Sequence, residues 1–210
     1  MTVTKGAKAP SRWLLLALIS GSILLADQAT KFLAVAHLTS AFSSVNATNP
    51  GEKLAAFVSQ KDLLERGLTT GQVHVFQSWF GLRYTQNRGA AWGFLSGARE
   101  GFRIPFFHLV TLAAILFITS YYRKLEEGQR YLQTALALLL GGALGNGLDR
   151  ALRGYVIDFI DWHWRDPNWA APSHHWPTFN VADCGVSIGL LLLFLEMFFA
   201  RQPAPSGSAP

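Results

Sequence analysis

Charged residues are scarce in this chain. Asp, Glu, Lys and Arg make up 15% of its 210 residues, whereas apolar residues make up 50%, and the mean hydropathy is +0.22. A disordered protein has the opposite balance, with few apolar residues and a high net charge. The composition therefore excludes an intrinsically disordered chain and favours a protein that resides in a membrane. The length suits one domain.

Cysteine is nearly absent, and the positive charge is not concentrated. The single Cys184 excludes an internal disulfide framework, and because no zinc-type Cys/His spacing surrounds it, we expect a packed thiol. The net charge of +5 comes from Lys and Arg residues that lie mainly at the ends of apolar runs. They do not form a basic stripe with interleaved aromatic residues, so nucleic acid is not an expected partner.

Four apolar stretches are each close to the ~20 residues that a helix needs to cross the hydrocarbon of a bilayer. They cover about 13–36, 104–122, 131–148 and 181–200. Four spans put both termini on one side, and basic residues before the first stretch, between the second and third, and after the fourth place that side in the cytoplasm. The first stretch has a second interpretation as a cleaved signal peptide, although it is longer than a typical apolar signal region.

The segments between the spans on the opposite side have a different composition. Residues 149–180 are rich in Trp, which favours the membrane interface. In the other segment, residues 41–75 resemble an insertion with a short amphipathic helix over 54–68, and the pattern that follows predicts short strands around a turn at Gly81. The final residues, 201–210, are expected to be a disordered tail.

Ionisable groups at the ends of the spans are costly to bury, so each one needs a partner or a function. Asp27 and Lys31 are four residues apart, which predicts a salt bridge on one helix face. Because an acid near a helix C-terminus opposes the helix dipole, Asp27 should also accept hydrogen bonds from a neighbouring element. Asn146, Asp149 and Arg150 share a face at the end of the third stretch. They indicate either an Asp149–Arg150 pair that ends the helix or a substrate contact in which Asp149 holds Arg150.

Two carboxylates are the candidate catalytic groups. Asn180 and Asp183 open the fourth stretch, and helix capping alone would explain their spacing. Asp158 lies among apolar residues with no local partner, so it needs a proton or a neighbour. If its segment folds back on the bundle, Asp158 reaches Asp183, and two carboxylates in one site cannot both ionise easily. One can then activate a water molecule while the other polarises the scissile carbonyl, as in an aspartic peptidase.

Five short motifs, in this order along the chain, resemble those of the lipoprotein signal peptidase family. They are Asp27-x-x-x-Lys31, Asn87-x-Gly89-Ala90-Ala91-Trp92, Gly145-Asn146-x-x-Asp149-Arg150, Val156-x-Asp158-Phe159 and Phe179-Asn180-x-Ala182-Asp183. The resemblance covers about 13–200. Two features depart from the family pattern, since residues 41–75 are longer than the usual first outer segment and Trp92 stands where Phe is common.

The resemblance implies an all-α membrane protein with four transmembrane helices, a small periplasmic β-sheet and interfacial loops, in one domain over residues 1–200. It implies an aspartic endopeptidase of the bacterial inner membrane that removes the signal peptide from diacylglyceryl-modified prolipoproteins, cutting before the lipidated Cys at the periplasmic side. Membrane lipids and inhibitors of the globomycin type are the other expected partners, and neither a metal nor another cofactor is expected.

Together with the spacing arguments, the resemblance divides the candidate site residues into three groups. The catalytic pair is Asp158 and Asp183. The substrate-binding residues are Asn87, Asn146, Arg150 and Asn180. The structural support consists of Asp27, Lys31, Gly89 and Asp149.

Two other functions fit parts of the sequence. A metal-dependent hydrolase would use Asp161, His163, His174 and His175, but adjacent histidines do not easily face one ion, and the sequence has no His-Glu-x-x-His motif. Asp161 is instead expected to be solvated or interfacial. A transporter or assembly factor without enzymatic activity would place charged groups across the bilayer, whereas here they gather at one face.

Overall fold

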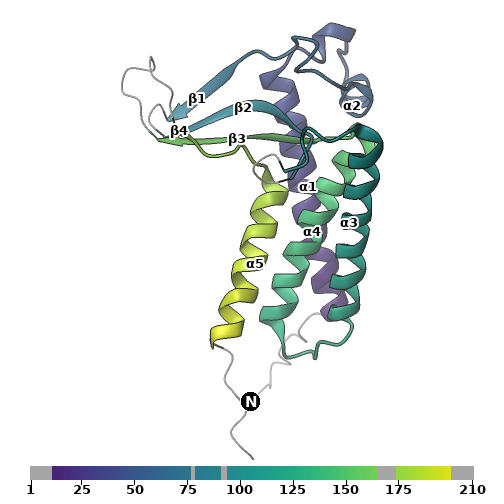
Figure 1. Cartoon of the computed structure of the whole chain (residues 1–210), viewed down its shortest axis with the longest axis vertical. Coiled ribbons are helices and arrows are strands. Elements are labelled where there is room, and N and C mark those ends of the chain that lie inside the picture. The colour runs from purple at the N-terminus through teal and green to yellow at the C-terminus, as the bar shows by residue number, and fades with distance from the viewer. Residues whose placement is uncertain (1–10, 77–78, 91–93, 165–173, 200–210) are drawn as a thin grey trace, which may run out of the picture.

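The computed structural model describes residues 11–76, 79–90, 94–164 and 174–199. Its long helices form a bundle and are α1 (Arg12–Leu38), α3 (Glu100–Tyr122), α4 (Arg130–Arg153) and α5 (Val181–Phe199). A sheet lies across one end of the bundle, whereas the start of α1, the end of α5 and the α3–α4 connection lie at the other end (Figure 1). The predicted tail over 201–210 and Trp92 fall outside the described residues.

Helices α1, α3 and α5 are long and apolar enough to cross a membrane. Helix α4 has 24 residues, but within the described part of the chain it does not reach that hydropathy, because glycines and polar residues interrupt it. The predicted fourth span over 131–148 is therefore not confirmed. Helix α4 packs against each of the other three helices, and its Gln133 and Asp149 are fully buried. A helix whose neighbours are protein needs less apolar surface than one that faces lipid.

Glycines allow α4 to approach its neighbours closely. A Cβ atom at Gly142 would lie 2.5 Å from the carbonyl oxygen of Ala182 and 2.6 Å from Cγ2 of Val186, both on α5. A Cβ atom at Gly141 would lie 2.7 Å from the Cβ of Ile23 on α1. Small residues at helix interfaces are typical of membrane proteins, where packing rather than the hydrophobic effect joins the helices.

We expect Gly142→Ala to lower the thermal stability of the detergent-solubilised protein, because the added methyl group must push α5 away. The loss should be about 1–3 kcal/mol, the usual cost of overpacking. Gly21→Ala is the matched control, since a Cβ atom at Gly21 on α1 meets nothing within 4 Å. Thermal unfolding followed by circular dichroism compares the two variants, and equal melting temperatures would contradict the close contact of α4 with α5.

The sheet is antiparallel, in the order β1 (Gln72–Phe76), β2 (Phe80–Asn87), β3 (Val156–Trp164) and β4 (His174–His175). The predicted turn at Gly81 is wrong, because Gly81 lies inside β2, opposite His74 on β1 and Asp161 on β3. A Cβ atom there would lie 3.0 Å from the carbonyl oxygen of Val73 and 3.0 Å from Nε2 of Gln72. Glycine at this position leaves room for side chains from the neighbouring strands.

A short helix, α2 (Pro50–Ser59), lies near the sheet end of the bundle (Figure 1). The predicted helix over 54–68 is therefore placed too late in the chain. Asn49 and Glu52 form a capping box that starts α2, with Pro50 in the first turn, where its fixed φ angle is favourable. Beyond Ser59 the chain turns, and Asp62 has a positive φ angle of 56°.

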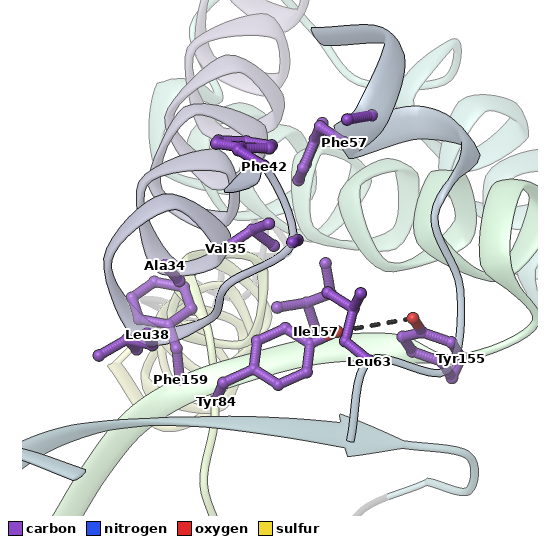
Figure 2. Packing of buried hydrophobic residues seen from close by; sticks show 12 residues of the cluster. Ala34, Val35, Leu38, Phe42, Phe57, Leu63, Tyr84, Tyr155, Ile157 and Phe159 are labelled. Carbon is purple, nitrogen blue, oxygen red and sulfur yellow. Dashed lines mark hydrogen bonds between the residues drawn. The ribbon is translucent and has the colours of Figure 1, made fainter. Parts of the chain in front are cut away.

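Buried side chains between α1, α2 and the sheet form one core cluster (Figure 2). Val35 and Leu38 of α1 pack there with Phe57 of α2, together with residues of β2 and β3. Figure 2 also shows the contact between the hydroxyl groups of Tyr84 and Tyr155, which are 3.5 Å apart. Each large apolar side chain that is buried contributes about 1.5–3 kcal/mol. The cluster thereby fixes β3 against the end of α1.

Candidate active site

A fully buried lysine at the sheet end of the bundle is shared by two carboxylates. Nζ of Lys31 on α1 lies 2.8 Å from Oδ2 of Asp27 on the same helix and 2.8 Å from Oδ2 of Asp149 on α4. All three side chains have 0% exposure. The predicted Asp27–Lys31 pair is therefore present, and the pattern gave no indication that Lys31 also contacts Asp149.

The same two carboxylates hold the backbone of other elements. Oδ1 of Asp27 accepts a hydrogen bond from the N–H of Ala182 in the first turn of α5, at 3.0 Å. Oδ2 of Asp149 accepts one from the N–H of Ile157 on β3, also at 3.0 Å. The expectation that Asp27 accepts a hydrogen bond from a neighbouring element is confirmed. Lys31 thus links α1 to α4 directly and to α5 and β3 through its partners.

Asp149 pairs with Arg153 and not with Arg150. Nη1 of Arg153 lies 2.8 Å from Oδ1 of Asp149, and Nη2 donates to the carbonyl oxygen of Phe57 at 2.7 Å. The expected Asp149–Arg150 pair is wrong because successive residues on a helix point about 100° apart, whereas residues four apart are neighbours. Sequence reasoning missed Arg153, and its spacing of four from Asp149 was the available signal.

Arg150 contacts the segment after β2 and a ring of α3. Its Nη2 donates to the carbonyl oxygen of Gly89 at 2.9 Å, and the guanidinium lies 4.6 Å from the centre of the Phe107 ring. The N–H of Gly89 donates in turn to Oδ1 of Asn87 at 3.0 Å. The structure therefore brings the predicted residues Asn87, Gly89 and Arg150 together.

Asp158 and Asp183 meet at Asn180. Asp158 is buried on β3, and Asp183 lies in the first turn of α5. Nδ2 of Asn180 donates to Oδ1 of Asp158 at 2.7 Å, and the backbone N–H of Asn180 donates to Oδ2 of Asp183 at 3.1 Å. The N–H of Asp183 donates back to Oδ1 of Asn180 at 2.9 Å. Asn180 and Asp183 therefore form a capping box, and Asn180 also joins this box to Asp158.

Asn146 on α4 connects the carboxylate pair to the buried ion pairs. Its Nδ2 donates to Oδ1 of Asp183 at 2.7 Å. Its Oδ1 accepts hydrogen bonds from Nδ2 of Asn180 at 3.1 Å and from Nζ of Lys31 at 3.3 Å. The amide of Asn146 thus joins Lys31 to Asp183 directly and to Asp158 through Asn180.

The surroundings raise the pKa of Asp158 from 3.8 to about 7. Burial is the largest cause because it disfavours the charged form, and the neighbouring Asp183 adds repulsion. Hydrogen bonds from the side chains of Asn87 and Asn180 lower the pKa, but they do not cancel the rise. A carboxyl group that titrates near neutral pH can hold the proton in an acid–base pair.

Asp158→Asn should change how stability depends on pH. A carboxyl group whose pKa rises from 3.8 to about 7 on folding stabilises the folded state below pH 3.8, and this contribution is lost as the pH increases through 7. The amide does not titrate, so the melting temperature of the variant, relative to the parent, should be higher above pH 7 than near pH 4. Thermal unfolding across this range measures the difference, and parallel curves would refute the raised pKa.

Asp161 was expected to be solvated or interfacial, but it is fully buried. The expectation is wrong because β4 pairs with β3 and covers it, so that His175 reaches Asp161 with its Nδ1 2.8 Å from Oδ1. The neighbouring His174 is exposed. The argument that adjacent histidines do not face the same group is therefore confirmed.

Long apolar helices that end beside two carboxylates, each hydrogen-bonded to Asn180, are the arrangement expected of a membrane-embedded peptidase of the aspartic class. Residues 19–199 match the family model for signal peptidase (SPase) II. A lipoprotein signal peptidase of Anaeromyxobacter sp. (strain Fw109-5) is 48% identical over 198 residues, which cover 94% of this chain and 91% of the relative. That of Bacillus subtilis (strain 168) is 37% identical over 145 residues, covering 69% and 86%. The chain belongs to the signal peptidase II family.

Two solved structures of bacterial membrane enzymes have the same fold. One has a TM-score of 0.61 at 24% identity and covers 93% of this chain and 94% of its own. The other has a TM-score of 0.57 at 25% identity and covers 89% of this chain and 94% of its own. The arrangement of the bundle and sheet therefore also occurs in membrane enzymes of low sequence identity.

Proposed function

We propose that this signal peptidase II uses Asp158 and Asp183 as its catalytic pair to remove the signal peptide from diacylglyceryl-modified prolipoproteins, cutting before the lipidated Cys. The observation that carries the assignment is the joint contact of both carboxylates with Asn180, which lies 2.7 Å from one and 3.1 Å from the other. The pKa of about 7 at Asp158 supports it, because the pair then holds a proton near neutral pH.

In the proposed reaction, the ionised member of the pair takes a proton from a water molecule, which attacks the scissile carbonyl carbon. Asp158, in its protonated form, donates a hydrogen bond to the carbonyl oxygen and then gives its proton to the leaving amine. Asn146 and Asn180 hold the carboxylates in place through amide groups that carry no charge. The peptide bond is hydrolysed directly, without an acyl-enzyme and without a cofactor.

The proposal also places the protein in the bacterial inner membrane with all four long helices across it, including α4. Arg12, Arg123 and Arg130 lie at the end of the bundle opposite the sheet, which favours the cytoplasm at that end. The sheet and the carboxylate pair then lie on the periplasmic side. The exposed indoles of Trp162 and Trp164 on β3 suit the membrane interface at that end.

Asp158→Asn and Asp183→Asn should each reduce cleavage of a lipidated model prolipoprotein by at least about 100-fold, because Asn keeps the volume but cannot accept or donate the catalytic proton. The purified variants should remain folded in detergent. Asp62→Asn is the matched control, since its half-exposed side chain pairs with Arg88. A gel assay that resolves precursor from product, run beside the unlipidated substrate, measures the effect. Substantial turnover by either variant would exclude this catalytic pair.

Arg150 is proposed to position the substrate, and Arg150→Lys tests this role. Lysine keeps the charge but loses the planar group that bonds Gly89 and stacks on Phe107. We expect the apparent KM to increase and globomycin binding to weaken, each by about tenfold or ~1.4 kcal/mol, while the pH profile of kcat is unchanged. Arg66→Lys, an exchange at an exposed arginine, is the control. A variant that loses its fold instead would show that Arg150 is only structural.

A further inference from the structure

Asp161, His163 and His175 form a second polar cluster on the sheet. His163 on β3 and His175 on β4 are direct cross-strand partners. Asp161 lies two residues before His163, so the two side chains point to the same face of β3. One potential ligand atom from each of the three residues lies within 4.8 Å of the others. The register of two strands thus creates the cluster.

The distances within the cluster are close to those of a metal site. Nδ1 of His175 lies 2.8 Å from Oδ1 of Asp161, and Nδ1 of His163 lies 3.3 Å from Oδ2. Zinc binds nitrogen and oxygen ligands at about 2.0–2.2 Å, which separates tetrahedral ligand atoms by roughly 3.3 Å. The His163–Asp161 distance matches this separation, the His175–Asp161 distance is about half an ångström shorter, and all three ligand atoms lie within 4.8 Å of one another.

The cluster is buried on the sheet and reached from one side. The side chains of Asp161 and His163 are 0% and 1% exposed, whereas that of His175 is 25% exposed. Gly81 on β2 contributes space, since a Cβ atom there would lie 3.5 Å from Cε1 of His163. Ligands on paired strands are held in position before an ion arrives, and an ion can enter past His175.

Gln72 and Arg83 both contact the carboxylate of Asp161. The side chain of Gln72 donates a hydrogen bond to Oδ2 of Asp161 and so orients the carboxylate, as outer groups around a metal do. The guanidinium of Arg83 lies 3.6 Å from Oδ1, and its side chain is 41% exposed. Arg83 can therefore turn to solvent when a cation replaces it as the partner of the carboxylate.

We propose that Asp161, His163 and His175 bind a divalent transition-metal ion with a structural role, and that Zn²⁺ fits best. Two imidazoles and one carboxylate are a three-ligand zinc set, and water would fill the fourth position. Ligation through Nδ1 puts the proton of each neutral ring on Nε2. Strand β4 has two residues. The ion would fasten it to β3, a few residues before Asn180 and α5.

Titration of the full-length, untagged, chelator-treated protein with Co²⁺ and Zn²⁺ tests the site. We expect one equivalent of Co²⁺ to give the absorption bands of a tetrahedral ion, Zn²⁺ to displace it, and Zn²⁺ to raise the melting temperature. His175→Ala and Asp161→Asn should weaken metal binding by more than about tenfold. Even substitutions of residues that only hydrogen-bond to a metal ligand reduce metal affinity by about that factor. His108→Ala is the control, because His108 is exposed on α3.

Asp161→Asn can fail to fold because the carboxylate is buried, so the partly exposed His175→Ala, checked by circular dichroism, decides the test. Absence of the Co²⁺ bands and of the Zn²⁺ shift in the parent would overturn the proposal, and so would parent-like binding by His175→Ala. Chelation should lower the melting temperature while the folded enzyme keeps its turnover. Turnover that is lost well below the unfolding temperature and restored by Zn²⁺ would overturn the structural role.

Discussion

The buried ammonium group of Lys31 is the interaction on which the rest of the structure depends. A charge removed from water is tolerated only if it is paired, and removing one partner of a buried pair costs about 3–5 kcal/mol. Asp27 and Asp149 both contact Lys31, and Arg153 balances the second carboxylate, so the four groups are neutral together. Asp27 and Asp149 also bind backbone N–H groups of α5 and β3. The pairing that neutralises Lys31 therefore also fixes the position of the site.

The carboxylates of Asp158 and Asp183 differ from those of Asp27 and Asp149 in the groups that bind them. Asp158 and Asp183 receive hydrogen bonds from the amides of Asn180 and Asn146, which supply donors without a net charge. A lysine in direct contact with Asp158 would strongly favour its ionised form. Because the side-chain amides of Asn146 and Asn180 stand between Lys31 and Asp158, the pKa of Asp158 stays near 7, the range in which a carboxyl group can serve as an acid. Ion pairs therefore join the helices of the bundle, whereas neutral amide groups hold Asp158 and Asp183.

Much of this arrangement follows from spacing in the sequence, and the errors have physical causes. The Asp27–Lys31 pair depends on contacts within one helix, and the sequence contains that information. Asp149 pairs with Arg153 and not with the adjacent Arg150, because residues four apart share a helix face and successive residues do not. The burial of Asp161 and the place of Gly81 inside β2 depend on how strands pair, and pairing joins residues such as 81 and 161 that no local pattern relates.

Two side chains from different parts of the chain bind the first turn of α5, and this affects how easily that end of the helix unfolds locally. Helix termini normally fray first, at little cost in free energy. Here Asn180 binds the N–H of Asp183, and Asp27 of α1 binds the N–H of Ala182. Fraying of α5 would take Ala182 from Asp27, which also serves the buried Lys31. We therefore expect this helix end to open only together with the buried ion pair, so that the amide hydrogens of Ala182 and Asp183 exchange slowly.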